Sequence, residues 1–176
     1  MVCVAYGDIY YLERDQFIKE TMRTKIKDII YVGIQFMLFA IYLLEVKNLR
    51  YNLPEFIQFI LLPFIVAGIA VILISLFQLN KNLSPFPSPK ENSELITTGL
   101  FSKIRHPIYS GILLLAFSFA LYQNSGFKIL ISFFLLTLFY FKTGYEEKQL
   151  SLKFPEYKNY KMNTGRFFPK IKFQTK

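Results

Sequence analysis

The sequence has only one cysteine, Cys3, and one histidine, His106. A single cysteine excludes an internal disulfide and a cysteine metal cluster, and it gives no information about the redox compartment. A single histidine argues against a metal site built on histidine ligands, so we expect no bound metal. Acidic residues are also few: 12 Asp and Glu stand against 21 Lys and Arg, which gives a formal net charge of +9.

Long apolar runs are what the sequence does contain. Of its 176 residues, 53% are hydrophobic and 18% aromatic, and they occur in blocks rather than at the spacing of a soluble amphipathic helix. The blocks predict an all-α integral membrane protein with about four transmembrane helices, at Ile29 to Leu44, Phe56 to Leu79, Ile108 to Tyr122 and Phe127 to Phe141. Only the second comfortably exceeds the roughly 20 residues that cross a bilayer. A buried soluble core is the alternative.

The placement of the basic residues predicts the orientation of these spans. Cytoplasmic loops of membrane proteins carry an excess of positive charge. With four spans, every Lys and Arg except Lys47, Arg50 and Lys128 falls on one side, so both termini and the central loop are expected in the cytoplasm. A net charge of +9 is also typical of nucleic-acid binding, but these cations lie near the membrane ends, where anionic headgroups attract them. We therefore expect the bilayer, and no nucleic acid, as the partner.

The chain is expected to form one membrane-embedded domain in three parts: an interfacial segment 1–28, the first two spans within 29–79, and 80–176 with a loop, the last two spans and a surface helical tail. Residues 9–27 are either a surface helix or a solvated leader. Three alternating prolines predict a stiff, extended connector at Leu83 to Pro89. In the tail, a break at Phe154 before Pro155 predicts two short surface helices.

Two charged clusters flank the hairpin formed by the last two blocks. Ile104 to Gly111, with the sequence IRHPIYSG, precedes the third block, and Tyr145-Glu146-Glu147 follows the fourth. Counted from the turn Gln123 to Gly126, His106 lies about 18 residues before and Glu146 about 21 after, so their depths differ by roughly 4 to 5 Å if both segments are helical. The clusters are therefore expected to frame one site at one membrane surface.

Pro107 is well placed as the first residue of the third helix. Arg105 and His106 then lie at the positive end of that helix, beside unpaired backbone NH groups. Such an end binds a carboxylate or a phosphate. The alternative is that both residues are interfacial anchors that contact lipid headgroups.

Glu146 and Glu147 are acidic residues at the end of a span, within a basic tail. They do not favour anionic lipid and need a cation. Lys142 one turn earlier, or Arg105 across the hairpin, would give a structural ion pair. The functional alternative is a bound cationic ligand.

Three segments in order, GLFSKIRHPIYSG, EEKQLSLKFPEYKNY and GRFFP, together with the preceding connector LSPFPSP, carry a family resemblance. They resemble the isoprenylcysteine carboxyl methyltransferase family of integral membrane enzymes. The resemblance covers about Leu83 to Pro169, half the chain. It implies transfer of a methyl group from S-adenosylmethionine to a lipophilic small-molecule or lipid acceptor presented from the bilayer, such as a carboxylate.

The resemblance also implies residue roles. The cofactor is expected to contact Leu95, Ile96, Phe101, His106, Pro107, Ile108, Tyr109 and Glu146. Arg105 and Lys142 are expected to orient an acidic acceptor, and Arg105 and Glu146 are the expected catalytic residues. Displacement at a methyl carbon needs no protein nucleophile, because positioning and desolvation lower its barrier.

Two departures from the family pattern leave the acceptor open. Lys142 stands where the eukaryotic enzymes have arginine, and it lacks the guanidinium fork that recognises a carboxylate with two hydrogen bonds. Phe101 stands where members often have tyrosine. A phospholipid amine, or another small lipophilic acid or thiol, is an alternative acceptor to prenylcysteine.

Three other classes of protein compete with this prediction. The absence of a GxGxxG loop disfavours a soluble Rossmann-type methyltransferase. Membrane sterol reductases have a similar C-terminal segment and bind NADPH around RHPNY, but Ile108 replaces the asparagine here, and Glu146 suits a cationic cofactor better than a phosphate. A non-enzymatic membrane protein, whose basic tail binds anionic lipid or a partner, would tolerate changes at Glu146 and His106 without losing more than stability.

Overall fold

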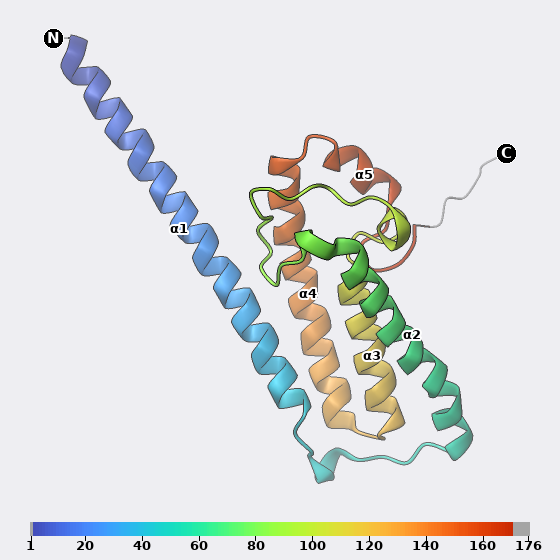
Figure 1. Cartoon of the computed structure of the whole chain (residues 1–176). Helices are drawn as coiled ribbons and strands as arrows, with labels where there is room; N and C mark the ends of the chain where they lie inside the picture. Colours follow the sequence, from blue (N-terminus) through green and yellow to red (C-terminus); the bar gives the residue numbers. More distant parts are fainter. Residues whose placement is uncertain (1, 171–176) are drawn as a thin grey trace.

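The computed structural model describes residues 2–170, with the side chains of residues 22–47 and 49–170. These residues form five α-helices: α1 (Val2–Tyr42), α2 (Glu55–Leu79), α3 (Pro107–Tyr122), α4 (Gly126–Lys153) and α5 (Tyr157–Asn163). Short 3₁₀ turns occur at η1 (Lys47–Leu49), η2 (Asn80–Asn82) and η3 (Gly99–Ser102). No strand forms within the described residues, which confirms the all-helical prediction. In Figure 1, α2, α3 and α4 run side by side, and α1 diverges from them toward the N-terminus.

Two helices of the described chain, α2 and α4, are long and apolar enough to cross a membrane, whereas α3 is apolar but shorter. Only Gly68 and Ser75 are buried along α2, and side chains such as Phe59 and Phe77 are 70% and 81% exposed. An apolar surface of this extent is typical of contact with lipid rather than water. Both observations are consistent with the predicted membrane protein.

The two helices α2 and α3 approach each other through a pair of glycines. A β-carbon at Gly68 would lie 2.9 Å from the backbone nitrogen of Leu115, and one at Gly111 would lie 2.9 Å from the carbonyl oxygen of Gly68. Small residues at such crossings let helix backbones come close in membrane proteins. This contact fixes α3 against α2 on one side.

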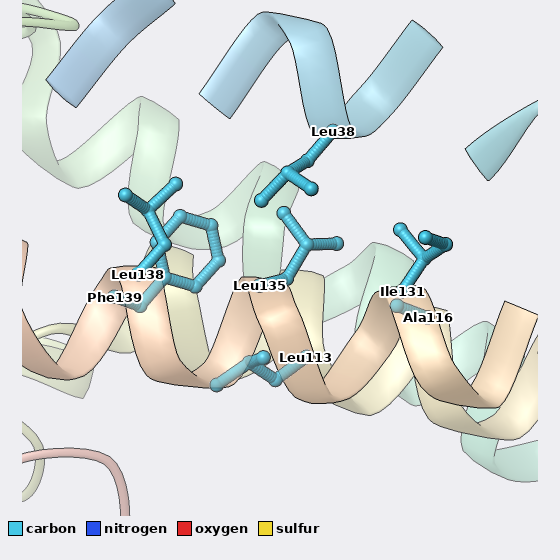
Figure 2. Packing of buried hydrophobic residues seen from close by; sticks show 7 residues of the cluster. All are labelled: Leu38, Leu113, Ala116, Ile131, Leu135, Leu138 and Phe139. Carbon is cyan, nitrogen blue, oxygen red and sulfur yellow. The ribbon is translucent and has the colours of Figure 1, made fainter. Parts of the chain in front are cut away.

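The buried core joins α1, α3 and α4. Figure 2 shows Leu38 of α1 reaching toward Leu135 of α4. Phe139 of α4 is fully buried, and the hydroxyl of Tyr42 donates to the carbonyl of Ala116 at 2.7 Å. These contacts hold the C-terminal half of α1 against the α3–α4 hairpin.

Two helices are longer than the sequence predicts. Instead of an interfacial segment ending at 28 and a span starting at 29, α1 is one continuous helix from Val2 to Tyr42, because no proline interrupts it. The lipid-facing or solvated character of residues 9–21 lies outside the described side chains. Likewise, α4 continues beyond Phe141 to Lys153. The prediction of a separate surface helix before Phe154 is therefore wrong, because these residues are part of α4.

The other predicted turns and helix boundaries are found in the structure. The α3–α4 turn lies at residues 123–125, with Asn124 in the left-handed region at φ 55°. The chain breaks at Phe154, and α5 begins shortly after Pro155. The proline-rich connector has no regular structure, as predicted, but it bends at residues 85–88 instead of running extended. Pro107 is the first residue of α3, and His106 is its N-cap.

Candidate functional site

The ten residues predicted for the site gather where α3 begins and where α4 approaches its end. They surround two adjoining cavities that both border Phe101, Arg105 and Glu146. The first, of about 110 Å³, lies between the connector, α4 and α5, and we call it the loop cavity. The second, of about 270 Å³, lies between α1, the connector and the α3–α4 hairpin, and we call it the hairpin cavity. Leu95 and Ile96 border only the loop cavity; His106, Pro107, Ile108, Tyr109 and Lys142 border only the hairpin cavity.

The tail returns to this site and fixes the start of α3. The backbone nitrogen of Arg105 donates to the carbonyl of Gly165 at 2.8 Å, and that of His106 donates to the carbonyl of Arg166 at 3.1 Å. The Ser110 hydroxyl donates to the carbonyl of Phe167 at 2.8 Å. The GRFFP segment therefore positions both residues that precede α3.

Glu147 is the centre of a buried charge cluster. Its side chain is 1% exposed and accepts from Arg105 Nε at 2.8 Å and Lys161 Nζ at 2.7 Å. His106 Nε2 and Arg166 Nε lie 3.3 and 3.4 Å from the same carboxylate. A carboxylate in this position is tolerated because cations surround it. Glu147 ties α4 to α5, to the tail and to the start of α3.

This cluster decides between the two sequence interpretations of Arg105 and His106. Their side chains are 8% and 3% exposed, so they are not interfacial anchors in contact with headgroups. The anion at the start of α3 is the protein's own Glu147. Arg105 Nη1 also donates to the carbonyls of Thr164 and Lys161, so most of this guanidinium is already engaged.

Glu146 differs from its neighbour in both partners and surroundings. It borders both cavities, and its side chain is 23% exposed. It accepts from the Tyr109 hydroxyl at 3.2 Å, and His106 Nδ1 lies 3.8 Å away. Within the part of the chain that the structure describes, neither Lys nor Arg forms an ion pair with Glu146. The cavities therefore contain a carboxylate that can accept a cationic ligand.

Lys142 supplies the cation of the hairpin cavity. Its ammonium donates to Gln35 Oε1 at 2.6 Å and to the carbonyl of Pro85 at 3.0 Å, and it lies 5.3 Å from the centre of the Tyr109 ring. The Tyr109 ring in turn stacks on Phe139 at 4.7 Å between centres. These contacts hold Lys142 at the junction of α1, the connector and α4.

Several residues of the site were not predicted. Gln35 of α1 borders the hairpin cavity; a lone amide between Ile34 and Phe36 in an apolar run was the signal for it. Tyr157 and Tyr160 of α5 border the loop cavity. Burial raises the pKa of Tyr160 to about 12 and moves the pKa of Tyr157 further upward, so both phenols stay neutral. The Tyr160 hydroxyl donates to the carbonyl of Phe101 at 2.5 Å.

The site thus combines an accessible carboxylate, a fixed ammonium and apolar walls at one end of the helical bundle. Such a set can hold a ligand that carries a cationic group beside apolar parts. In a comparison with known protein families, residues 57–156 match the phospholipid methyltransferase family. The match spans more than half the chain and contains all ten predicted site residues. No curated protein matches the chain.

Proposed function

Because the chain belongs to the phospholipid methyltransferase family, we propose that it transfers a methyl group from S-adenosylmethionine to a lipophilic acceptor at the membrane surface. The family makes the chain a membrane methyltransferase, and it includes the isoprenylcysteine carboxyl methyltransferases that the sequence motifs resemble. The sterol reductase and the non-enzymatic membrane protein are not favoured by this membership.

The observation that carries the proposal is the contrast between Glu146 and Glu147. One carboxylate is surrounded by cations of the chain, whereas the other faces the cavities with a tyrosine hydroxyl and a histidine ring as neighbours. S-adenosylmethionine supplies an electrophilic methyl group on a sulfonium and also carries an ammonium. In the proposal, Glu146 binds the amine or the ribose hydroxyls of the cofactor.

The other predicted cofactor residues form the walls around Glu146. Leu95, Ile96 and Phe101 give an apolar lining to the loop cavity. The segment from His106 to Tyr109 borders the hairpin cavity. Apolar walls exclude water from the reacting groups, which strengthens each electrostatic contact inside the site.

Lys142 is the proposed contact for the acceptor. Gln35 and the Pro85 carbonyl fix its ammonium in the wall of the hairpin cavity, where it would orient a carboxylate or a phosphate as a point charge. The family resemblance implies the same task for Arg105. Since Glu147 and two carbonyls already engage Arg105, its proposed part is to add positive potential at the wall shared by both cavities.

Methyl transfer needs no covalent participation of the protein. The acceptor atom attacks the methyl carbon as the bond to sulfur breaks, so no side chain needs to act as a nucleophile. The residues accelerate the step by holding two reactants in line and away from water. A prenylcysteine carboxylate and a phospholipid amine are both compatible with this arrangement.

In the proposed topology, four spans cross the membrane, within α1, α2, α3 and α4. The support is the placement of Lys and Arg within residues 2–170: all but Lys47, Arg50 and Lys128 lie at the end of the bundle that holds the two cavities or in the segments continuous with it. The positive-inside rule then makes that end and both termini cytoplasmic.

Calorimetric titration of the detergent-solubilised protein tests the proposal. The protein would be titrated in parallel with S-adenosylmethionine, its demethylated product S-adenosylhomocysteine and NADPH. We expect binding of the first two and none of NADPH. Selective binding of NADPH would instead support a reductase, and a folded sample that binds none of the three would support the non-enzymatic alternative.

Transfer of a radiolabelled methyl group then identifies the acceptor class. The labelled cofactor would be offered with vesicles that contain either a prenylcysteine carboxylate or phosphatidylethanolamine. Label in a base-labile ester indicates a carboxylate acceptor, whereas label in a base-stable headgroup indicates an amine. Label in neither product would contradict both assignments of the acceptor.

A further inference from the structure

Besides the loop cavity and the hairpin cavity, a polar pocket lies at the opposite end of the bundle. It has a volume of about 210 Å³ and is formed by the loop after α1 and the α3–α4 turn. Its lining residues are Glu45, Val46, Arg50, Gln123, Ser125 and Lys128. The backbone of Tyr51 donates to the Asn124 carbonyl, and that of Leu53 donates to the Asn124 side chain, both at 3.1 Å. These bonds hold the two walls together.

Lys128 is a buried cation that lacks an anionic partner. The residue is 6% exposed, and its ammonium donates to Gln123 Oε1. It lies 5.6 Å from the centre of the Tyr42 ring and 5.2 Å from that of Phe119. Among the described residues, no acidic side chain forms an ion pair with it. A buried charge without a counter-ion is costly, so this position favours an anion.

The second cation of the pocket does not change this balance. The side chain of Arg50 pairs with Glu45 at 3.1 Å, and both are more than half exposed. The two charges cancel, and the charge of Lys128 remains. Arg50 is nevertheless close enough to line the pocket, so its guanidinium can share an anion with Lys128.

An apolar groove adjoins this pocket. It has a volume of about 640 Å³ and is lined by α1 and α3, with Leu135 of α4. Tyr42 and Phe119, the two rings beside the Lys128 ammonium, belong to its lining. Its lining also includes Ile112, so the groove extends along the bundle toward the hairpin cavity, which Ile112 borders too. Figure 1 shows α1 diverging from the rest of the bundle toward its N-terminus.

We propose that an anionic phospholipid binds here, with its phosphate against Lys128 and Arg50 and an acyl chain in the groove. The pocket offers an uncompensated cation, and the groove beside it offers almost no polar group. A free phosphate would satisfy the first feature and leave the second uncovered. This lipid lies at the membrane surface opposite the proposed active site, and its binding requires no methyl transfer.

Native mass spectrometry of the full chain, released from detergent after incubation with lipid, measures this binding directly. The probes are phosphatidylglycerol, which carries a net negative charge, and phosphatidylcholine, which carries none. Both lipids carry a phosphate, but the choline ammonium of phosphatidylcholine cancels its charge and would lie beside the cations of the pocket. We therefore expect phosphatidylglycerol to be retained about tenfold better, a difference of the size of one hydrogen bond to a charged group. Equal retention of the two lipids would overturn the proposal.

Three variants locate the site. Lys128→Met and the exposed Arg50→Gln should each reduce the preference for phosphatidylglycerol. Ala40→Trp, which fills the groove and leaves both cations in place, should reduce retention of either lipid. The matched control is Lys47→Gln, which removes an exposed cation from the same surface outside the pocket, and it should change nothing.

The outcomes that contradict the proposal are distinct. A Lys47→Gln effect as large as that of Arg50→Gln would show surface charge attraction alone. Displacement of phosphatidylglycerol by inorganic phosphate would show a phosphate site without a lipid chain. If Lys128→Met fails to fold, as judged by its melting temperature, Arg50→Gln and Ala40→Trp still decide, and unchanged retention in both would reject the site.

Discussion

Two adjacent carboxylates of α4 have opposite surroundings. Successive residues of a helix point about 100° apart, because 3.6 residues make one turn. Glu147 therefore faces the tail and α5, where Arg105, Lys161 and Arg166 surround it, and Glu146 faces the cavities. The same substitution at the two positions should accordingly have different consequences.

Replacing Glu146 with Gln should weaken cofactor binding and leave the fold intact. The amide keeps the size of the side chain and can still accept from Tyr109, but it carries no charge for the cofactor's ammonium. We expect the affinity for S-adenosylmethionine to fall by at least about tenfold, the value of one charged hydrogen bond. Calorimetry of Glu146→Gln beside Glu91→Gln, an exposed acid outside both cavities, tests this. Native affinity in Glu146→Gln would refute the assignment of the cofactor amine.

Replacing Glu147 with Gln should mainly destabilise the protein. The change leaves Arg105 buried without its counter-ion, and removal of one partner from a buried ion pair costs about 3 kcal/mol or more. We expect a lower melting temperature in detergent, measured by intrinsic fluorescence. A variant that melts like the native protein yet loses cofactor binding would show that Glu147, too, belongs to the binding site.

At the residue scale, the sequence predicts that the two charged clusters meet, but it does not predict which of Glu146 and Glu147 faces the cavities. His106 and Glu146 could be brought together by counting helical rise from the turn, and they lie 3.8 Å apart. The choice between Glu146 and Glu147 depends on the rotation of α4 about its axis and on where the tail returns. Neither quantity can be read from spacing. The same holds for the contact between Gln35 and Lys142, which are 107 positions apart.

At the element scale, breakers are predictable and the ends of uninterrupted helices are not. Pro107, the 123–126 turn and Pro155 mark boundaries that the structure keeps. Hydropathy instead ends the fourth block at Phe141, yet the helix continues to Lys153. Lys and Glu, the charged residues of this extension, are good helix formers, so a change from apolar to charged composition marks the membrane surface rather than the end of the helix here.

The crossing of α2 and α3 gives a prediction at this scale. Gly68→Ala would place a methyl group 2.9 Å from the backbone of Leu115, so the two helices must separate. We expect a loss of about 1 to 3 kcal/mol, as in other overpacked contacts, seen as a lower melting temperature. Gly33→Ala is the matched control, because nothing lies within 4 Å of the added methyl and alanine favours the helix. Equal melting temperatures for the two variants would contradict the close crossing.

At the scale of the whole molecule, the two ends of the bundle differ in chemistry. One end holds the buried charge cluster and the two cavities of the proposed active site. The other holds a short loop, a tight turn and the pocket around Lys128. Since cytoplasmic ends retain most Lys and Arg, the asymmetry predicts the orientation of the molecule.

Labelling of single cysteines tests this orientation. Cys3 is the only native cysteine. A Cys3→Ser background therefore allows two separate variants, each with a single thiol at one end of the bundle. Glu91→Cys and Lys47→Cys both replace exposed side chains, the first in the loop just after the connector and the second in the loop beyond α1. A membrane-impermeant maleimide added to intact cells should label only the thiol at 47, and inverted vesicles should reverse the result. Labelling of both thiols from one side would mean that residues 47 and 91 lie at the same membrane surface. That result would contradict the proposed single crossing of the membrane by α2, which separates them in the chain.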